Sequence, residues 1–354
     1  MRQIRRRATM TDVADAAGVS LKTVSRHVNG ETNIDPAISV RISAAIASLN
    51  FRRNLAAASI RPGQRSQLVG LIIEDIANPF YAALTRAVER VLRERGMLLM
   101  AASSEEDPGL FCRLVEQFIE RRVDGLIVVP PATSGPQWPA LAEEIPALVL
   151  IDRSDDEIDA DTILADDECG AHAATDLLIS GGSRRIAFVG EALAVPTIAA
   201  RFRGYSAALA QAGLTTDTAL ILDGVRTTQD TAAAATELLA GSHPVDGIFT
   251  ANNRASIGVL RAFRGLGTRR AMVGFDDFEA ASLVEPGVTV VTQNVPDMGR
   301  LAAETLLRRI NGDLAPAQRV ILPTTIIRRG SEMTAPGHFS YSRRPSEEKD
   351  GTAQ

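Results

Sequence analysis

The feature that most constrains the fold is an alternation of short apolar runs with longer amphipathic segments, which begins at Leu68. The runs have the length of buried strands, and the segments between them repeat apolar residues at helical spacing. Predicted strands lie at residues 68–73, 97–102, 125–129, 147–151, 185–189, 247–250 and 271–275. Predicted helices lie at about 81–95, 110–121, 169–179, 198–211, 231–239 and 257–265. This alternation predicts an α/β fold with doubly wound parallel sheets.

The alternating region spans roughly 260 residues, which is more than one small sheet of this kind needs. We therefore expect two lobes, each with its own parallel sheet. The chain has 354 residues in all, and its last part is polar. We expect residues 332–354 to be a disordered tail.

Three short helices are predicted before residue 50 from their end signals. Thr9 and Asp12 have the spacing of a capping box, and Gly18 ends the first helix. Ser20 can cap the second helix, and Asp35 stands before a proline at the start of the third. The first part of the chain is therefore expected to be all-α.

Residues 54–60 could form about two further helical turns before Pro62 stops them. A helix this short is not stable alone, so the segment is either a plain linker or a helix that folds only on a partner. We expect a head at residues 1–53, a hinge helix and linker at 54–65 and a two-lobed core at 66–331.

Charge is divided unevenly along the chain. Residues 1–65 carry eleven Lys/Arg and four Asp/Glu, whereas the other 289 residues carry 27 and 39, so a head of +7 precedes a body of −12. A basic head on an acidic body indicates that the head meets a polyanion. A merely solvated basic face is the alternative.

The first two predicted helices, with a glycine in the turn between them, are typical of a helix-turn-helix. The second helix exposes Leu21, Lys22 and Arg26 near its N-terminal part, where such motifs touch base edges. Thr23 and Ser25 are short donors suited to phosphate oxygens. A generic helical hairpin is the alternative. The candidate DNA contacts of the head are Thr9, Ser20, Leu21, Lys22, Thr23, Ser25, Arg26 and Asn29.

Residues 8–63 resemble the head and hinge of the lactose-repressor-type (LacI/GalR) transcription regulators, and the likeness continues to Ser331. The resemblance implies a helix-turn-helix head and a core like that of periplasmic sugar-binding proteins. It implies a homodimeric regulator of transcription, more commonly a repressor, that binds a pseudo-palindromic operator in double-stranded DNA. It also implies allosteric control by a small polar effector, a sugar or sugar derivative, bound between the two lobes.

In that family the second head helix enters the major groove of DNA and the hinge helix enters the minor groove. By the resemblance, the hinge contacts are Asn54, Ala57 and Ile60. Ile60 stands where the family usually has a leucine that wedges into a base step, and a β-branched wedge can still unstack a step. Arg53 stands where the family commonly has proline.

The resemblance also assigns effector-binding residues, which follow predicted strands at the edge where open α/β sheets bind ligands. They are Asn78, Phe80, Tyr81, Arg153, Arg201, Asn253, Asp276 and Gln293. Helix-start packing of the aromatic residues, or an ion pair between Arg201 and Asp276 without a ligand, is the alternative. Asn253 stands where the family commonly has Asp, and we interpret Asp166 and Asp167 as structural.

The charge of the ligand stays open at this point. Arg201 with Asp276 suits a neutral sugar, whereas Arg153 and Arg254 could admit a sugar acid or a phosphate. Induction and corepression are equally open, and the lack of a leucine heptad tail after Ser331 favours a dimer over a tetramer.

Several other function classes find no support in the sequence. No apolar run reaches the ~20 residues of a membrane helix, and no apolar segment follows the basic N-terminus, so we expect a cytoplasmic protein. Cys112 and Cys169 are expected to be buried in helices, and the histidines have no metal spacing. Motifs for a nucleophile, a phosphate loop or a zinc protease are missing, so we expect no enzyme, cofactor or metal. The rivals are a periplasmic sugar-binding protein and an enzyme on a doubly wound fold.

Overall fold

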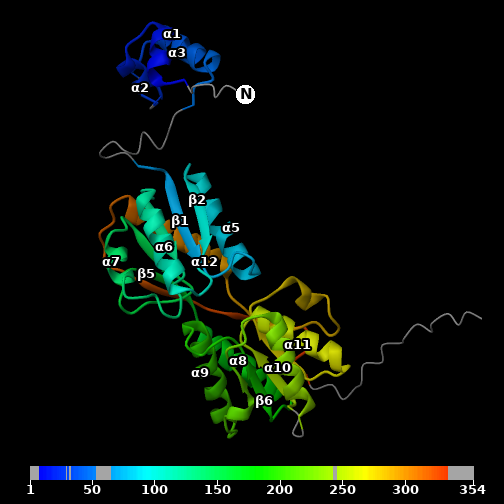
Figure 1. Cartoon of the computed structure of the whole chain (residues 1–354). Coiled ribbons are helices and arrows are strands. Elements are labelled where there is room, and N and C mark those ends of the chain that lie inside the picture. The colour runs from blue at the N-terminus through cyan, green and yellow to red at the C-terminus, as the bar shows by residue number, and fades with distance from the viewer. Residues whose placement is uncertain (1–7, 29, 32, 53–64, 242–244, 334–354) are drawn as a thin grey trace, which may run out of the picture. The chain divides into compact units, whose positions relative to one another are not determined.

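A computed structural model describes residues 8–28, 30–31, 33–52, 65–241 and 245–333. The chain divides into two compact units, Met1–Ser66 and Gln67–Gln354 (Figure 1). Within the described ranges, no helix combines the length and the apolar character that crossing a membrane requires. Four of the predicted DNA contacts lie outside the described residues, namely Asn29, Asn54, Ala57 and Ile60.

The described residues of the first unit form three helices packed around one small core. These are α1 (Met10–Ala17), α2 (Leu21–Val28) and α3 (Pro36–Ser48). The predicted capping box is present: the Thr9 hydroxyl accepts from the backbone N–H of Asp12, and the Asp12 carboxylate accepts from the N–H of Thr9. Asp35 accepts from two N–H groups at the start of α3. The buried core residues are Val13, Ala14, Ala17, Val24, Ile42 and Ala45.

The first lobe of the second unit is a parallel six-stranded sheet with the order β11-β5-β4-β3-β1-β2. Its strands are β1 (Leu68–Ile73), β2 (Leu98–Ser103), β3 (Gly125–Val128), β4 (Leu148–Ile151), β5 (Asp161–Ala165) and β11 (Arg319–Leu322). Its helices are α5 (Pro79–Glu94), α6 (Pro108–Glu120), α7 (Trp138–Glu143) and α12 (Val295–Ile310). Because α5 and α12 share one apolar cluster with the sheet and α6 and α7 share another, both faces of the sheet are covered.

The second lobe repeats this design with the strand order β12-β10-β9-β8-β6-β7. Its strands are β6 (Ile186–Val189), β7 (Ile221–Leu222), β8 (Gly247–Thr250), β9 (Ala271–Phe275), β10 (Thr289–Thr292) and β12 (Thr325–Ile327), of which β12 alone is antiparallel to its neighbour. Helices α8 (Asp167–Ser180) and α9 (Pro196–Gln211) cover one face, and α10 (Thr228–Ala240) and α11 (Asn253–Leu266) cover the other. Two short 3₁₀ turns, Thr218–Leu220 and Glu279–Ser282, join these elements.

The chain passes between the lobes three times. It leaves the first lobe after β5, returns to it between β10 and α12, and crosses again between β11 and β12. The orange-to-red end of the chain accordingly appears in both lobes of Figure 1. Each lobe is therefore built from separate stretches of sequence.

The predicted strands and helices are present with shifts of a few residues at their ends, but the pattern did not predict β5, β7, β10, β11, β12, α7 or α12. The strands β11 and β12 lie at sheet edges and keep exposed residues, so they lack a continuous apolar run. The expectation that Cys169 is buried is wrong, since this cysteine lies on the exposed side of α8, whereas Cys112 is buried as expected.

The folded core also extends one residue beyond the predicted boundary. Glu332 is 6% exposed, and its carboxylate accepts hydrogen bonds from the Thr289 hydroxyl and from the N–H of Gly330. These two donors satisfy a buried carboxylate, so Glu332 belongs to the second lobe and not to a tail.

Candidate DNA-binding face and ligand cleft

The first turn of α2 presents side chains on the surface of the head. Leu21 is 49% exposed and Lys22 is also exposed, while Val24 on the opposite side is fully buried and anchors the helix. Ser20 begins the helix, because its hydroxyl accepts from the N–H of Thr23 at 3.2 Å and lies 2.8 Å from the Thr23 hydroxyl. The arrangement leaves the start of α2 open to a partner.

Arg26 is more restrained than the sequence suggested. Its Nε donates to Glu31 at 2.7 Å and its Nη2 donates to the carbonyl of Asn33 at 2.9 Å. Thr23 and Ser25 are partly buried, whereas Thr9 and Ser20 are exposed. A base or phosphate contact by Arg26 would therefore replace contacts that the head makes to itself.

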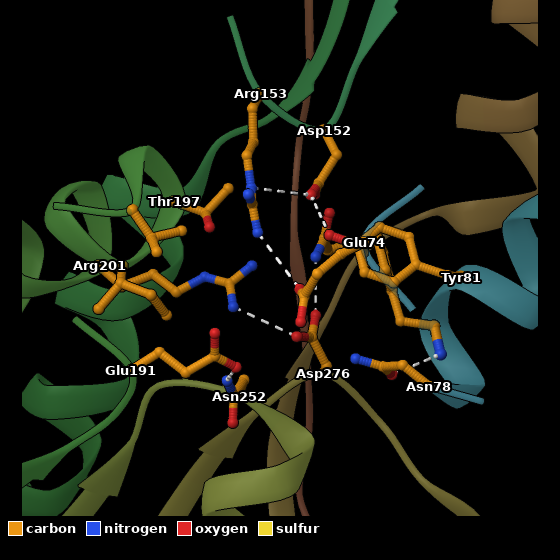
Figure 2. A pocket seen from close by; sticks show the side chains of 14 residues that line it. Glu74, Asn78, Tyr81, Asp152, Arg153, Glu191, Thr197, Arg201, Asn252 and Asp276 are labelled. Carbon is orange, nitrogen blue, oxygen red and sulfur yellow. Dashed lines mark hydrogen bonds and ion pairs between the residues drawn. The ribbon is translucent and has the colours of Figure 1, made fainter. Parts of the chain in front are cut away.

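In the core, polar side chains gather where the strands of both sheets end. The carboxyl ends of parallel strands form one edge of a sheet, and the two lobes turn these edges toward each other. The resulting cleft is lined by Glu74, Asn78, Phe80, Tyr81, Asp152, Arg153, Glu191, Val195, Thr197, Ile198, Arg201, Asn252, Asp276 and Gln293 (Figure 2). Its free volume is about 30 Å³, which is room for about one water molecule. The cleft is therefore filled by its own side chains.

Arg201, from α9, is the cationic centre of the second lobe. Its Nε donates to Asp167 at 2.7 Å, and its Nη1 donates to the carbonyl of Ala251 at 2.7 Å and to Asp276 at 3.2 Å. Its guanidinium carbon lies 3.8 Å from the centroid of the Phe275 ring. Asp276 also accepts from Gln293 Nε2 at 2.7 Å. A ligand hydroxyl placed here could accept from the guanidinium and donate to the carboxylate.

Arg153 is the cationic centre of the first lobe. It donates to Glu74 at 3.3 Å and to the carboxylate of Glu106, and its Nε lies 3.8 Å from Asp152. The Tyr81 hydroxyl donates to Asp152 at 3.0 Å. Figure 2 shows the side chains of Arg153, Asp152, Glu74 and Tyr81 directed toward the same space as Arg201 and Asp276.

Two further side chains join the lobes across the mouth of the cleft. Arg254, at the start of α11, donates from Nη1 to Glu74 at 2.9 Å and from Nη2 to Asp75. Asn253 Nδ2 donates to Asn78 Oδ1 at 2.9 Å. These contacts hold the lobes in a closed arrangement.

Three carboxyl groups in this region have raised pKa values. Burial raises the pKa of Asp152 to about 7, although Arg153 acts in the opposite direction. Burial and the neighbouring Glu74 raise the pKa of Glu191 to about 7, and burial raises that of Asp167 to about 6 despite its contact with Arg201. The region therefore holds more carboxyl groups than its guanidinium groups keep ionised.

Seven of the eight predicted effector-binding residues line the cleft, and the exception is Asn253. Its neighbour Asn252 takes that place, capping α11 through its oxygen and donating to Glu191 at 2.8 Å. The lining residues that the prediction missed are Glu74, Asp152, Glu191, Val195, Thr197, Ile198 and Asn252. Glu74 and Asp152 directly follow strands, and this position could have identified them.

Asp166 and Asp167 have the structural roles that we expected. Asp166 caps α8 by accepting from the N–H of Cys169 at 3.1 Å, and Asp167 is buried against Arg201.

In the part of the chain that the structure describes, no group of three or more His, Cys, Asp or Glu side chains could hold a metal ion.

Comparison with known proteins identifies two family patterns in the chain. Residues 9–54 match the pattern of bacterial regulatory proteins, lacI family, and residues 175–332 match a periplasmic binding protein-like domain. The chain is 34% identical over 337 residues to the ribose operon repressor of Escherichia coli (strain K12), covering 92% of this chain and 99% of that protein.

Two solved structures extend the comparison. The transcriptional regulator CelR in complex with cellobiose is 31% identical, with a TM-score of 0.68 over 92% of this chain and 100% of that one. The Lac repressor dimer bound to operator and the anti-inducer ONPF has a TM-score of 0.82 at 22% identity, over 93% of this chain and 100% of that one, and shows the shared fold.

Proposed function

This chain belongs to the lacI family of bacterial regulatory proteins, and from that premise we propose that it is a sequence-specific repressor controlled by a small polyhydroxylated effector. The observation that carries the proposal is the presence, in one chain, of an open helix-turn-helix face and a cleft lined by polar strand-end residues. We propose that it acts as a homodimer on a pseudo-palindromic operator, as in the operator complex of the Lac repressor dimer.

In the head, we propose that Leu21, Lys22 and Arg26 contact bases in the major groove. The exposure of the first turn of α2 supports this role for Leu21 and Lys22, and Arg can pair with guanine through two hydrogen bonds. Thr9, Ser20, Thr23 and Ser25 are proposed to contact phosphates, together with Asn29. Asn54, Ala57 and Ile60 remain the proposed minor-groove contacts.

In the core, we propose that the lobes separate to admit a sugar or sugar derivative, which binds among the cleft residues without turnover. Arg201 and Asp276 can serve one pair of ligand hydroxyls and Arg153 and Asp152 another, because each pair offers a donor beside an acceptor. Tyr81 and Phe80 offer apolar surface for a sugar ring. The names of the relatives, which include a ribose operon repressor and a cellobiose complex, support this ligand class.

The two activities are coupled by the closure of the lobes. A ligand that fits the cleft better in one arrangement of the lobes favours that arrangement, and it changes DNA affinity by no more than this preference. Such couplings are typically ~1–3 kcal/mol, which corresponds to about 5–150-fold in affinity.

The test begins with selection of duplexes from a random pool by the full-length protein, which identifies the operator directly. We expect a pseudo-palindromic sequence that binds at least about 10³-fold tighter than random duplex. A sugar that raises the melting temperature should then change the affinity for this duplex, and Asp276→Ala should remove the response. Selection without sequence preference would contradict a regulator, and an intact sugar response in Asp276→Ala would contradict the placement of the effector.

A further inference from the structure

The wall of the cleft carries more negative charge than its own cations balance. Three guanidinium groups, from Arg153, Arg201 and Arg254, contact seven carboxylates in and beside the cleft. The carboxylates belong to Glu74, Asp75, Glu106, Asp152, Asp167, Glu191 and Asp276. If all were ionised, four negative charges would lack a cation. Six of the seven carboxylate side chains, all except Asp75, are at most 10% exposed, so at least three of these charges would be buried, which is strongly unfavourable.

Among the carboxylates that line the cleft, Glu191 has the longest contact with a cation. Its Oε1 accepts from the neutral amide of Asn252 at 2.8 Å, and Arg254 Nη1 is 3.9 Å away. Arg254 is already bound more closely by Glu74 and Asp75. Glu191 is 5% exposed and its contact with Arg254 is long, so its charge is only weakly stabilised by solvent and by this cation.

The buried polar atoms without a partner at the cleft are mainly acceptors. Gln293 Oε1 and Asn253 Oδ1 accept no hydrogen bond. The amide nitrogens of these residues donate to Asp276 and Asn78, and these bonds fix the direction in which each oxygen points. Arg153 Nε is the unpartnered donor, and it lies within 3.8 Å of Asp152. Of these two residues with an unpartnered acceptor, Gln293 lines the cleft, so its oxygen can accept from a ligand donor. An ammonium group offers three donors and no acceptor.

When the cleft is closed, bound protons neutralise some of the carboxylates that lack a compensating cation. Burial raises the pKa of Glu191 and that of Asp152 to about 7, so both groups bind a proton near neutral pH. A cationic ligand group beside Glu191 would take the place of its proton and leave a charge-assisted hydrogen bond.

We propose that the effector is a polyhydroxylated molecule that carries an amine, such as an amino sugar, and that Glu191 binds its ammonium group. The inference rests on the proposed function, because it concerns the ligand of the same cleft. The hydroxyl groups of such a ligand meet Arg201, Asp276 and Arg153, while Glu191 sets the preference for the amine. A sugar acid is disfavoured, since Arg153 and Arg254, which suggested it from the sequence, are already held by carboxylates.

The experiment is calorimetric titration of the full-length protein with three matched sets of compounds near neutral pH. Each set holds a parent sugar, its amino sugar and its acid, in the glucose, galactose and ribose series. We expect the amino sugar of at least one series to bind about tenfold or more tightly than its parent sugar, because it forms an additional charge-assisted hydrogen bond. The heat of that binding should differ between phosphate and Tris buffers, since the ammonium group displaces a proton.

The variants Glu191→Gln and Glu237→Gln make the same chemical change inside and outside the cleft, because Glu237 is exposed on α10 of the same lobe. Glu191→Gln should bring the affinities for amine and parent sugar close together, and Glu237→Gln should preserve their ratio. If Glu191→Gln does not fold, the proton release of the unaltered protein still tests the proposal.

The outcomes separate this inference from the proposed function. If parent sugars bind and amino sugars bind no tighter, or if the preference survives in Glu191→Gln, the cleft keeps its proposed function and the amine proposal fails. Tighter binding of the acids would overturn it as well. If no compound of any charge binds, the proposed sugar-controlled function fails, and the amine proposal fails with it.

Discussion

The head and the core each place an arginine where we expect a partner, and the two arginines differ in burial. Arg26 pairs with Glu31 at 2.7 Å and its side chain is 35% exposed, whereas Arg201 pairs with Asp167 at the same distance and is 4% exposed. An exposed pair contributes little because water solvates both partners, whereas a buried carboxylate that loses its cation is costly. At the same distance, the ion pair in the head can therefore be replaced by contacts with DNA at little cost, whereas the ion pair in the core stabilises the fold.

The largest effect is expected for Arg201→Met. The change leaves Asp167 and Asp276 buried without their shared cation, so the free energy of unfolding should fall by about 3–5 kcal/mol. Urea denaturation of the full-length protein measures this loss. The matched control is Arg203→Met in the same helix, where the pair with Glu168 at 2.9 Å is exposed and should contribute less than about 1 kcal/mol. Equal losses in the two variants would show that burial does not distinguish the two ion pairs.

The second prediction concerns pH. Burial raises the pKa of Asp152 to about 7 in the folded protein, above its value of about 4 in an unfolded chain. The stability from this proton is therefore fully present below about pH 4 and is lost as the pH rises through about 7. We expect the free energy of unfolding to fall by a few kcal/mol between pH 5 and pH 8 (order of magnitude). Asp152→Asn should reduce this dependence, while Glu191 and Asp167 keep part of it. An unchanged slope would show that Asp152 is ionised throughout.

A smaller effect is expected at the head. Arg26→Ala should weaken binding to the selected operator by ~1–3 kcal/mol, because the bidentate contact to guanine is lost. Binding to random duplex should weaken much less. Fluorescence anisotropy with both duplexes measures the two affinities at one salt concentration. Equal losses would make Arg26 a phosphate contact and would remove its proposed role in reading bases.

The smallest effect is expected for Glu31→Gln. The ion pair with Arg26 is exposed, so its loss should lower the free energy of unfolding by less than about 1 kcal/mol. Operator binding should tighten by a few-fold, because Arg26 is released and one negative charge leaves the DNA-binding face. The gain should shrink as salt is raised. Weaker operator binding would show instead that Glu31 orients Arg26 for its contact.

The sequence predicted those features whose cause is local. Thr9, Asp35 and the turn at Gly18 act through neighbouring backbone groups, and the structure shows each of them in the expected place. The strand-end positions of Arg153 and Asp276 could also be predicted, because parallel strands carry their carboxyl ends to one edge of a sheet.

The rest of the site depends on contacts that are distant in the sequence. Asn252 and Asn253 are adjacent, and the sequence alone could not show that Asn253 turns toward Asn78 while Asn252 borders the cavity. Glu191 lies in a loop beyond β6, and it is buried at a cleft that residues of both lobes line. The pairing of Arg254 with Glu74 and Asp75 likewise spans both lobes, so its charge seemed free for a ligand when the sequence alone was considered.

The three passages of the chain between the lobes also have a consequence for synthesis. The first five strands of the first lobe leave the ribosome long before α12, whose Met298, Ala302 and Leu306 complete the apolar core beneath them. Roughly 130 residues separate β5 from α12, which is on the order of ten seconds of translation. During that interval α5 alone covers this face of the nascent sheet while the second lobe is being made, so we expect this to be the period in which the growing chain most needs a chaperone.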